Sequence, residues 1–248
     1  MGLREFVVLD DHEALVAAAA ERIAAVLEAV GPRAAVCLTG GSTVTPVYRA
    51  LAAPPLRRRI PVGRIDWFFG DDRFVPPDHA LSNVAQARAT LLDPLGVPAG
   101  RVHAMPTAAT DPDAAAREYE TTLVAHYGVG RLDPARPLFD LVLLGMGPDG
   151  HVASLFPGKP QIEESERWVV GVDDAGHPPL VPRVSLTLPA LASSRALLFI
   201  VSGQDKRPAL SRLLAGDDLP AARVRSTGPV TWLVDRAAAP QTLIEDHS

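Results

Sequence analysis

Short runs of apolar residues alternate along the chain with longer segments in which apolar residues recur every three or four positions. The first pattern is typical of buried β-strands and the second of amphipathic helices. We expect strands at residues 5–9, 34–40, 65–70, 102–105, 139–145, 167–172, 183–188, 196–201 and 230–234. We expect helices near residues 11–30, 45–53, 83–92, 112–127 and 205–215.

Continuous apolar strands separated by amphipathic helices indicate an α/β fold with a doubly wound, mostly parallel sheet and helices on both faces. The first helix also carries boundary signals, because Asp10 and Glu13 resemble a capping box and Gly31-Pro32 marks a stop. No linker or internal repeat interrupts the pattern. We therefore expect a single domain over residues 1–248.

Composition narrows the class of protein. The chain has 248 residues, of which 47% are hydrophobic, and a net charge of −5 without a basic arm. Binding to nucleic acid usually requires a basic surface, so we expect no nucleic-acid partner. Cys37 stands alone in an apolar run, which fits a reducing compartment. The first residues lack the apolar core of a signal peptide and no run reaches membrane-spanning length, so we expect a cytoplasmic protein without a membrane partner.

Ligands of open parallel sheets bind beyond the carboxyl ends of the strands. The loop LTGGSTVTPVY (38–48) leaves such an end at Gly40, Gly41 and Ser42. Glycines let backbone N–H groups approach an anion, and the following helix adds partial positive charge, so the loop is a candidate phosphate site. A tight turn with a serine cap explains the same residues, and this alternative stays open.

The loop FFGDDRFVPPDHALSN (68–83) places Asp71, Asp72 and Arg73 directly after an apolar strand. Three consecutive charges at this position can line a ligand crevice, where Arg73 would contact an anion or a polarised carbonyl. The alternative is a solvated loop with a local ion pair.

The stretch GMGPDGH (145–151) follows another apolar strand and presents Asp149 and His151 at the expected mouth of a helix. A neutral imidazole is suited to take a proton from water near neutral pH, and a nearby acid such as Asp149 can hold the ring in the required tautomer. The alternative is a helix-capping or solvent-exposed histidine.

The loop IVSGQDKRPAL (200–210) ends a strand at a glycine and puts Lys206 in the first turn of a helix. Lysine is unfavourable at a helix N-terminus unless an anion lies nearby, so Lys206 is a candidate phosphate ligand. Arg183 opens a strand and is either a further cation of the site or an ordinary edge arginine.

The chain lacks the spacing of metal ligands and the GxSxG motif of serine hydrolases. We therefore expect no catalytic metal, no cofactor and no covalent intermediate.

Four segments together, LTGGST…PVY, WFFGDDRFVPPDHALSN, GMGPDGHVASLFPG and VSGQDKRPAL, resemble the bacterial-type 6-phosphogluconolactonases in order and spacing. The resemblance covers residues 5–235. It implies the fold shared with glucosamine-6-phosphate deaminase and ribose-5-phosphate isomerase. It also implies hydrolysis of 6-phospho-D-glucono-1,5-lactone to 6-phosphogluconate, the second step of the oxidative pentose phosphate pathway.

The resemblance further implies roles for individual residues. His151 corresponds to the base that activates water, and Asp71 and Arg73 correspond to a pair associated with substrate binding and catalysis. Phosphate contacts fall on Lys206 and on the glycine-rich loop, here Gly40, Gly41 and Ser42, with Arg183 as a less certain match.

Two positions depart from the family pattern: Val44 follows Thr43 where many relatives have proline, and Asp72 stands in place of a glutamate. Two other functions remain open, a glucosamine-6-phosphate deaminase or sugar-phosphate isomerase, and a non-catalytic sugar-phosphate sensor. We expect the partner to be a small phosphorylated sugar lactone, and the protein to be a monomer or a small homo-oligomer.

Overall fold

The computed structural model describes residues 4–245. Its strands are β1 (Arg4–Leu9), β2 (Ala34–Leu38), β3 (Ile65–Phe69), β4 (Asp71–Arg73), β5 (Leu141–Leu144), β6 (Val169–Val172), β7 (Arg183–Leu186), β8 (Leu197–Val201) and β9 (Val230–Asp235). Its α-helices are α1 (His12–Glu28), α2 (Val44–Ala52), α3 (Asn83–Ala87), α4 (Asp93–Leu95), α5 (Pro112–Tyr127), α6 (Leu188–Ala192), α7 (Arg207–Leu214), α8 (Pro220–Arg223) and α9 (Gln241–Glu245).

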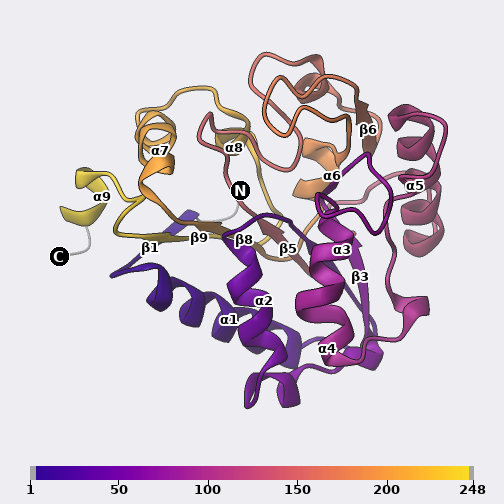
Figure 1. Ribbon diagram of the computed structural model, residues 1–248, viewed down its shortest axis with the longest axis horizontal. Helices are drawn as coiled ribbons and strands as arrows, with labels where there is room; N and C mark the ends of the chain where they lie inside the picture. The colour runs from indigo at the N-terminus through magenta and orange to yellow at the C-terminus, as the bar shows by residue number, and fades with distance from the viewer. Residues whose placement is uncertain (1–3, 246–248) are drawn as a thin grey trace.

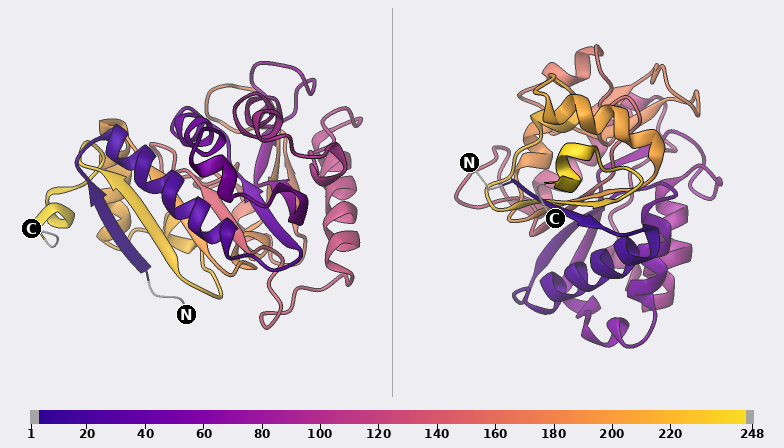
Figure 2. Two further views of the ribbon diagram at one scale, coloured as in Figure 1. Left: turned by 90° about the horizontal axis from the view of Figure 1, so that it is seen from below. Right: turned by 90° about the vertical axis from the view of Figure 1, so that its left-hand side faces the viewer.

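Six strands form a parallel sheet in the order β1-β9-β8-β5-β2-β3. Helices α1, α2 and α3 lie on one face of this sheet and α7 and α8 on the other (Figure 1). The right-hand view of Figure 2 shows the same separation, with the indigo and purple helices below the sheet and the orange and yellow ones above it. The expected doubly wound, mostly parallel α/β fold is confirmed.

A second sheet of three antiparallel strands has the order β4-β7-β6. The sequence predicted β6 and β7 as strands, but not that they form a sheet of their own. It did not predict β4 either, because three consecutive charged residues look like a polar loop. This small sheet matters for the site, since β4 continues from β3 after a single residue.

The strands of the large sheet are apolar because helices cover both faces. Every residue of β2, β3, β5 and β8 is buried, including Cys37, which is free. The ring of Trp232 stacks on Phe199 with centroids 3.6 Å apart. One cluster of buried apolar side chains runs from α1 to α9, and this supports a single domain, which stays a prediction.

Several local predictions need correction. Asp11, not Asp10, caps α1, because its carboxylate accepts a hydrogen bond from the N–H group of Ala14. The expected strand at 102–105 is reduced to one bridge between Val102 and Trp67. The helix near 83–92 is α3 followed by a π-helical turn. Within residues 4–245, no helix is both long and apolar enough to cross a membrane.

Candidate active site

A cleft opens where the chain order of the sheet reverses. From β2 the chain moves outward to β3, and from β5 it moves the opposite way to β8 and β9, so the switch point lies between β2 and β5. Ligands of open α/β sheets bind at this point. The loops that follow β2 and β5 both line the cleft, which has a volume of about 340 Å³, within the range of small-molecule sites.

Asp149 and His151 meet at the rim of this cleft. Asp149 Oδ1 lies 2.6 Å from His151 Nδ1 and also accepts a hydrogen bond of 3.1 Å from the backbone N–H of His151. Burial alone would raise the pKa of Asp149, but the hydrogen bond from His151 and the imidazole's charge lower the pKa to about 2. The ionised carboxylate keeps a proton on Nδ1 and leaves the lone pair of Nε2 available.

The turn that carries Asp149 and His151 is sterically restricted. A Cβ atom at Gly147 would lie 2.0 Å from His151 Nδ1 and 2.7 Å from Asp149 Oδ1, so only glycine leaves space for the imidazole. The helix expected after this turn is absent. Gly150 and Ala153 have φ angles of 88° and 48°, outside the right-handed helical region, and the chain continues as turns.

Asp71 and Arg73 line the cleft, whereas Asp72 does not. These three residues form β4, in which alternate side chains point to opposite faces. Asp71 Oδ2 accepts a hydrogen bond of 2.7 Å from Ser154 Oγ, and Oδ1 accepts one of 3.3 Å from Asn83 Nδ2. The carboxylate of Asp71 is therefore fixed before any ligand arrives.

The other carboxylate of β4 has a structural role. Asp72 Oδ1 accepts hydrogen bonds from the backbone N–H groups of Asn83 (2.6 Å) and Arg73 (2.8 Å), and Oδ2 accepts one from Ser82 Oγ (3.1 Å). It thus binds the first residues of α3. Burial raises the pKa of Asp72 to about 6, although these hydrogen bonds oppose the shift.

Arg73 and Arg183 stand side by side, since they are paired across β4 and β7. The guanidinium of Arg183 donates to the backbone carbonyls of Val181 (3.0 Å) and Pro179 (2.7 Å), so it also holds the loop before β7. Burial and the neighbouring charge of Arg73 lower the pKa of Arg183. Arg73 donates to Leu81 O at 2.9 Å, while its buried Nε has no partner among the described residues. Two adjacent cations in one cleft favour an anionic ligand.

The glycine-rich loop lines the cleft as expected, with its three residues Gly40, Gly41 and Ser42 next to the start of α2. A Cβ atom at Gly40 would lie 1.9 Å from the side chain of Asn83, so glycine lets the loop pack against α3. The N–H of Gly41 is already bonded to Gln86 Oε1 at 2.9 Å. An anion at this loop would therefore meet the N–H groups that follow Gly41, where α2 begins without a side-chain cap.

Lys206 also lines the cleft, from the 3₁₀ turn Gln204–Lys206 that precedes α7. It lies one residue before the helix rather than inside its first turn. Its Nζ contacts Asp205 Oδ2 at 2.9 Å, and its side chain is only 19% exposed. Lys206, whose charge was expected to be unfavourable at a helix N-terminus, thus lines the cleft with the exposed carboxylate of Asp205 as its partner.

Three residues of the site were not predicted. Asn83 and Ser154 hold Asp71, and His177 lines the cleft with its ring 5.1 Å from that of His151. His177 lies in the segment 176–182, whose prolines favour a surface loop. A histidine beside prolines within such a loop is the one sequence signal that this segment offers.

Within the described part of the chain, none of the groupings of histidine, cysteine and acidic side chains with metal-binding spacing lies in the cleft. The cleft offers instead an imidazole with an oriented carboxylate, a buried aspartate and three cations. This set can activate water and bind an anionic molecule.

Known proteins are similar to this chain in both sequence and fold. A family model described as glucosamine-6-phosphate isomerases/6-phosphogluconolactonase matches residues 10–232. The 6-phosphogluconolactonase of Streptomyces coelicolor is 41% identical over 96% of this chain and 94% of the relative, and that of Mycobacterium tuberculosis is 42% identical over 94% and 96%. The crystal structure of 6-phosphogluconolactonase from Thermotoga maritima has a TM-score of 0.82 at 32% identity, covering 94% of this chain and all of that one. The chain therefore belongs to the glucosamine-6-phosphate isomerase/6-phosphogluconolactonase family.

Proposed function

We propose that the protein hydrolyses 6-phospho-D-glucono-1,5-lactone to 6-phospho-D-gluconate, with His151 as the general base. The relatives from S. coelicolor and M. tuberculosis bear the name of this enzyme at more than 40% identity over nearly their whole length. The single observation that carries the mechanism is the 2.6 Å contact between Asp149 and His151 at the rim of a cationic cleft.

In the first step His151 Nε2 takes a proton from a water molecule as the water oxygen attacks C1 of the lactone. Asp149 makes this possible because it fixes the tautomer and stabilises the imidazolium that forms. No hydrogen bond from a described residue occupies Nε2, so this nitrogen is available to a water molecule.

The tetrahedral intermediate carries a negative charge on the former carbonyl oxygen. Arg73 or the backbone N–H groups of the 145–151 turn stabilise this oxyanion, and Arg183 adds a second positive charge beside Arg73. The carboxylate of Asp71, which Ser154 and Asn83 hold in place, adds a fixed negative charge near Arg183.

In the second step the bond between C1 and the ring oxygen breaks. The imidazolium of His151 returns its proton to this oxygen, which becomes the C5 hydroxyl group of the product. Atoms and charge balance with one water molecule consumed, and the reaction is neither oxidation nor reduction. The proposal therefore uses no cofactor.

The phosphate group would anchor the substrate. We assign it to Lys206 and to the start of α2 after the glycine-rich loop, since both line the cleft and provide positive charge. Binding energy from this remote group fixes the position of the lactone carbonyl.

A coupled assay tests the function. Glucose-6-phosphate dehydrogenase generates the lactone in place, and the rate of its opening is compared with and without the protein. We expect faster opening than the spontaneous rate and no release of ammonia from glucosamine 6-phosphate. Ammonia release would establish the deaminase alternative, and binding of 6-phosphogluconate without faster opening would establish the sensor.

Three expectations of the sequence stay predictions. Size-exclusion chromatography with light scattering should find a monomer or a small homo-oligomer. Cell fractionation should find the protein in the cytoplasm, and a filter-binding assay should detect no affinity for nucleic acid.

A further inference from the structure

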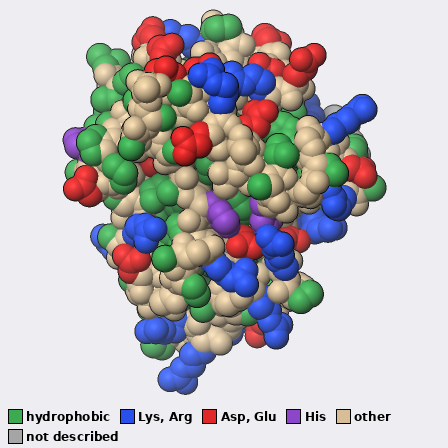
Figure 3. Space-filling model, turned by 90° about the vertical axis from the view of Figure 1, so that its right-hand side faces the viewer, with side chains coloured by type: hydrophobic (Ala, Val, Ile, Leu, Met, Phe, Trp, Pro, Cys, Tyr) green, Lys and Arg blue, Asp and Glu red, His purple; other side chains and the backbone are tan. Residues whose placement is uncertain are grey.

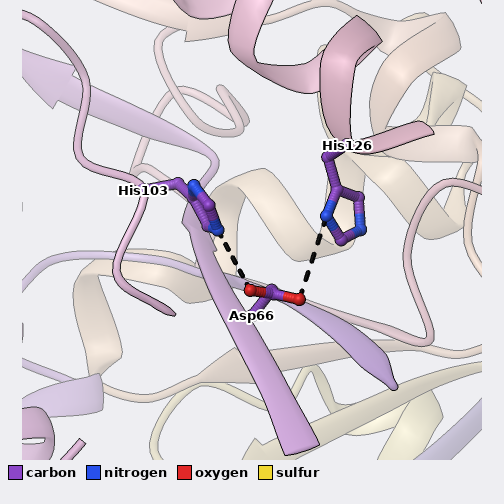
Figure 4. Close-up of side chains that lie close together, drawn as sticks. All are labelled: Asp66, His103 and His126. Carbon is purple, nitrogen blue, oxygen red and sulfur yellow. Dashed lines mark hydrogen bonds and ion pairs between the residues drawn. The ribbon is translucent and has the colours of Figure 1, made fainter. Parts of the chain in front are cut away.

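Three potential metal ligands meet at a place that the proposed reaction does not use. His103 Nε2 lies 3.2 Å from Asp66 Oδ1, and His126 Nδ1 lies 3.9 Å from Asp66 Oδ2 (Figure 4). All three ligand atoms lie within 4.8 Å of one another. The three residues come from β3, from the segment that follows the 3₁₀ turn Ala99–Arg101, and from the last turn of α5.

One aromatic ring holds both imidazoles. The ring of Phe68 stacks on His103 with centroids 4.4 Å apart and meets His126 edge-on at 4.8 Å. Because Phe68 is fully buried in β3, it restricts both rings before any ion binds. Rigid ligands lose little conformational entropy on binding.

Two arginines now occupy part of this place. Arg33 donates to Asp66 Oδ2 at 3.1 Å and contacts His126 Nδ1 at 3.1 Å, and Arg101 donates to Asp66 Oδ2 at 3.3 Å. The side chain of Arg33 is 64% exposed, and Asp66 keeps Arg101 as a partner, so Arg33 can leave. Arg101 can stay on Oδ2, since metal-bound carboxylates are commonly held by a second hydrogen bond.

We propose that Asp66, His103 and His126 form a binding site for a divalent transition-metal ion, with Zn²⁺ as the natural probe. Two imidazoles and one carboxylate leave the fourth tetrahedral position to water. Zinc bonds of about 2.0–2.1 Å separate neighbouring ligand atoms by roughly 3.3 Å, so the two rings need to move by about 1 Å.

The site is separate from the proposed active site. Asp66 is near the start of β3 and Asp71 follows its end, so the two are five positions, or roughly 16 Å of extended chain, apart. Both imidazoles are partly exposed. One face of the molecule shows histidine side chains with acidic and basic side chains around them (Figure 3). An ion here would tie α5 and the segment after η4 (Ala99–Arg101) to β3, and would stabilise the fold without taking part in hydrolysis.

Calorimetric titration of the metal-free protein with ZnCl₂ tests the site. We expect one Zn²⁺ per chain in the wild type and in His151→Ala, which separates this site from the imidazoles of the cleft. His103→Ala and His126→Ala should each weaken binding by at least about tenfold. Zn²⁺ should also raise the unfolding temperature of the wild type but not of these two variants.

Arg33→Ala is the decisive variant because its side chain is exposed and its loss should leave the fold intact. Removal of the competing cation should tighten Zn²⁺ binding by about tenfold. Arg22→Ala, which removes an exposed arginine paired with Glu5, is the matched control and should leave Zn²⁺ affinity unchanged. Equal affinity in the wild type and Arg33→Ala, or undiminished binding in both histidine variants, would overturn the proposal.

Discussion

The carboxylate of Asp149 lies 2.6 Å from His151 Nδ1, although only one residue separates the two in the chain. Residues two apart in a regular helix point in different directions, so this contact depends on the turn between them. The contact between Asp149 and His151 therefore requires that the expected helix does not form here. The pair supplies the first two predictions.

His151→Ala should fold normally and lose most of its hydrolytic rate. General-base catalysis typically contributes about 10²–10⁴-fold, and kcat in the coupled lactone assay should fall by this factor after correction for spontaneous opening. His126→Ala removes an imidazole at the far end of β3 and should keep the wild-type kcat. An unchanged kcat in His151→Ala would rule out His151 as the general base.

Asp149→Asn should lower kcat because the amide no longer fixes the tautomer or stabilises the imidazolium. Since the pKa of Asp149 is about 2, its carboxylate is ionised throughout the pH range of the assay. If Asp149 acts through His151, the double variant should be no slower than His151→Ala alone. Independent, multiplicative losses would instead assign Asp149 a contact of its own with the substrate.

Lys206→Ala should raise KM for the phosphorylated lactone by at least about tenfold and hardly change the kinetics with unphosphorylated gluconolactone. Asp205→Asn provides the opposite change, because it removes the carboxylate 2.9 Å from Nζ. That variant should lower KM for the phosphorylated substrate. An equal loss on both lactones in Lys206→Ala would contradict a phosphate contact.

Asp72 should make stability depend on pH. Its pKa is raised to about 6 in the folded protein, against about 3.9 in an unfolded chain. A proton thus binds more tightly to the folded state, so the stabilisation is fully present below about pH 4 and is lost as the pH rises through 6.

Asp72→Asn cannot ionise and should escape this loss. Its free energy of unfolding relative to the wild type should rise by about 2 kcal/mol between pH 4 and pH 7, as measured by urea unfolding. Asp93→Asn, with an exposed side chain, should run parallel to the wild type. A parallel curve for Asp72→Asn as well would show that burial of this carboxylate has no such effect.

The sequence predicted the large sheet well because all of its strands except β1 are buried and read as mainly apolar runs. It also placed Gly40, Arg73, His151 and Lys206 in loops at the carboxyl ends of these strands, and all four line one cleft. Their convergence follows from parallel topology alone, since those ends meet at the same edge of the sheet.

Other features depend on contacts between distant residues. Ser154 and Asp71 are 83 positions apart, and their hydrogen bond has no trace in the local pattern. The same is true of His103 and His126, whose spacing fits no motif and which meet only because both face β3. The small antiparallel sheet was not predicted because the charged residues of β4 look like a solvent-exposed loop. In the fold, the carboxylates of β4 instead accept hydrogen bonds from the backbone of α3 and from Ser154.

The absent side chain of Gly147 has a consequence for comparisons between related proteins. A single methyl group there would collide with His151 Nδ1 at 2.0 Å, while nothing in the six-stranded sheet would notice the change. Under the proposed mechanism, two chains of this family can therefore share the fold and nearly all of their sequence, and yet differ in catalytic rate because of this one residue.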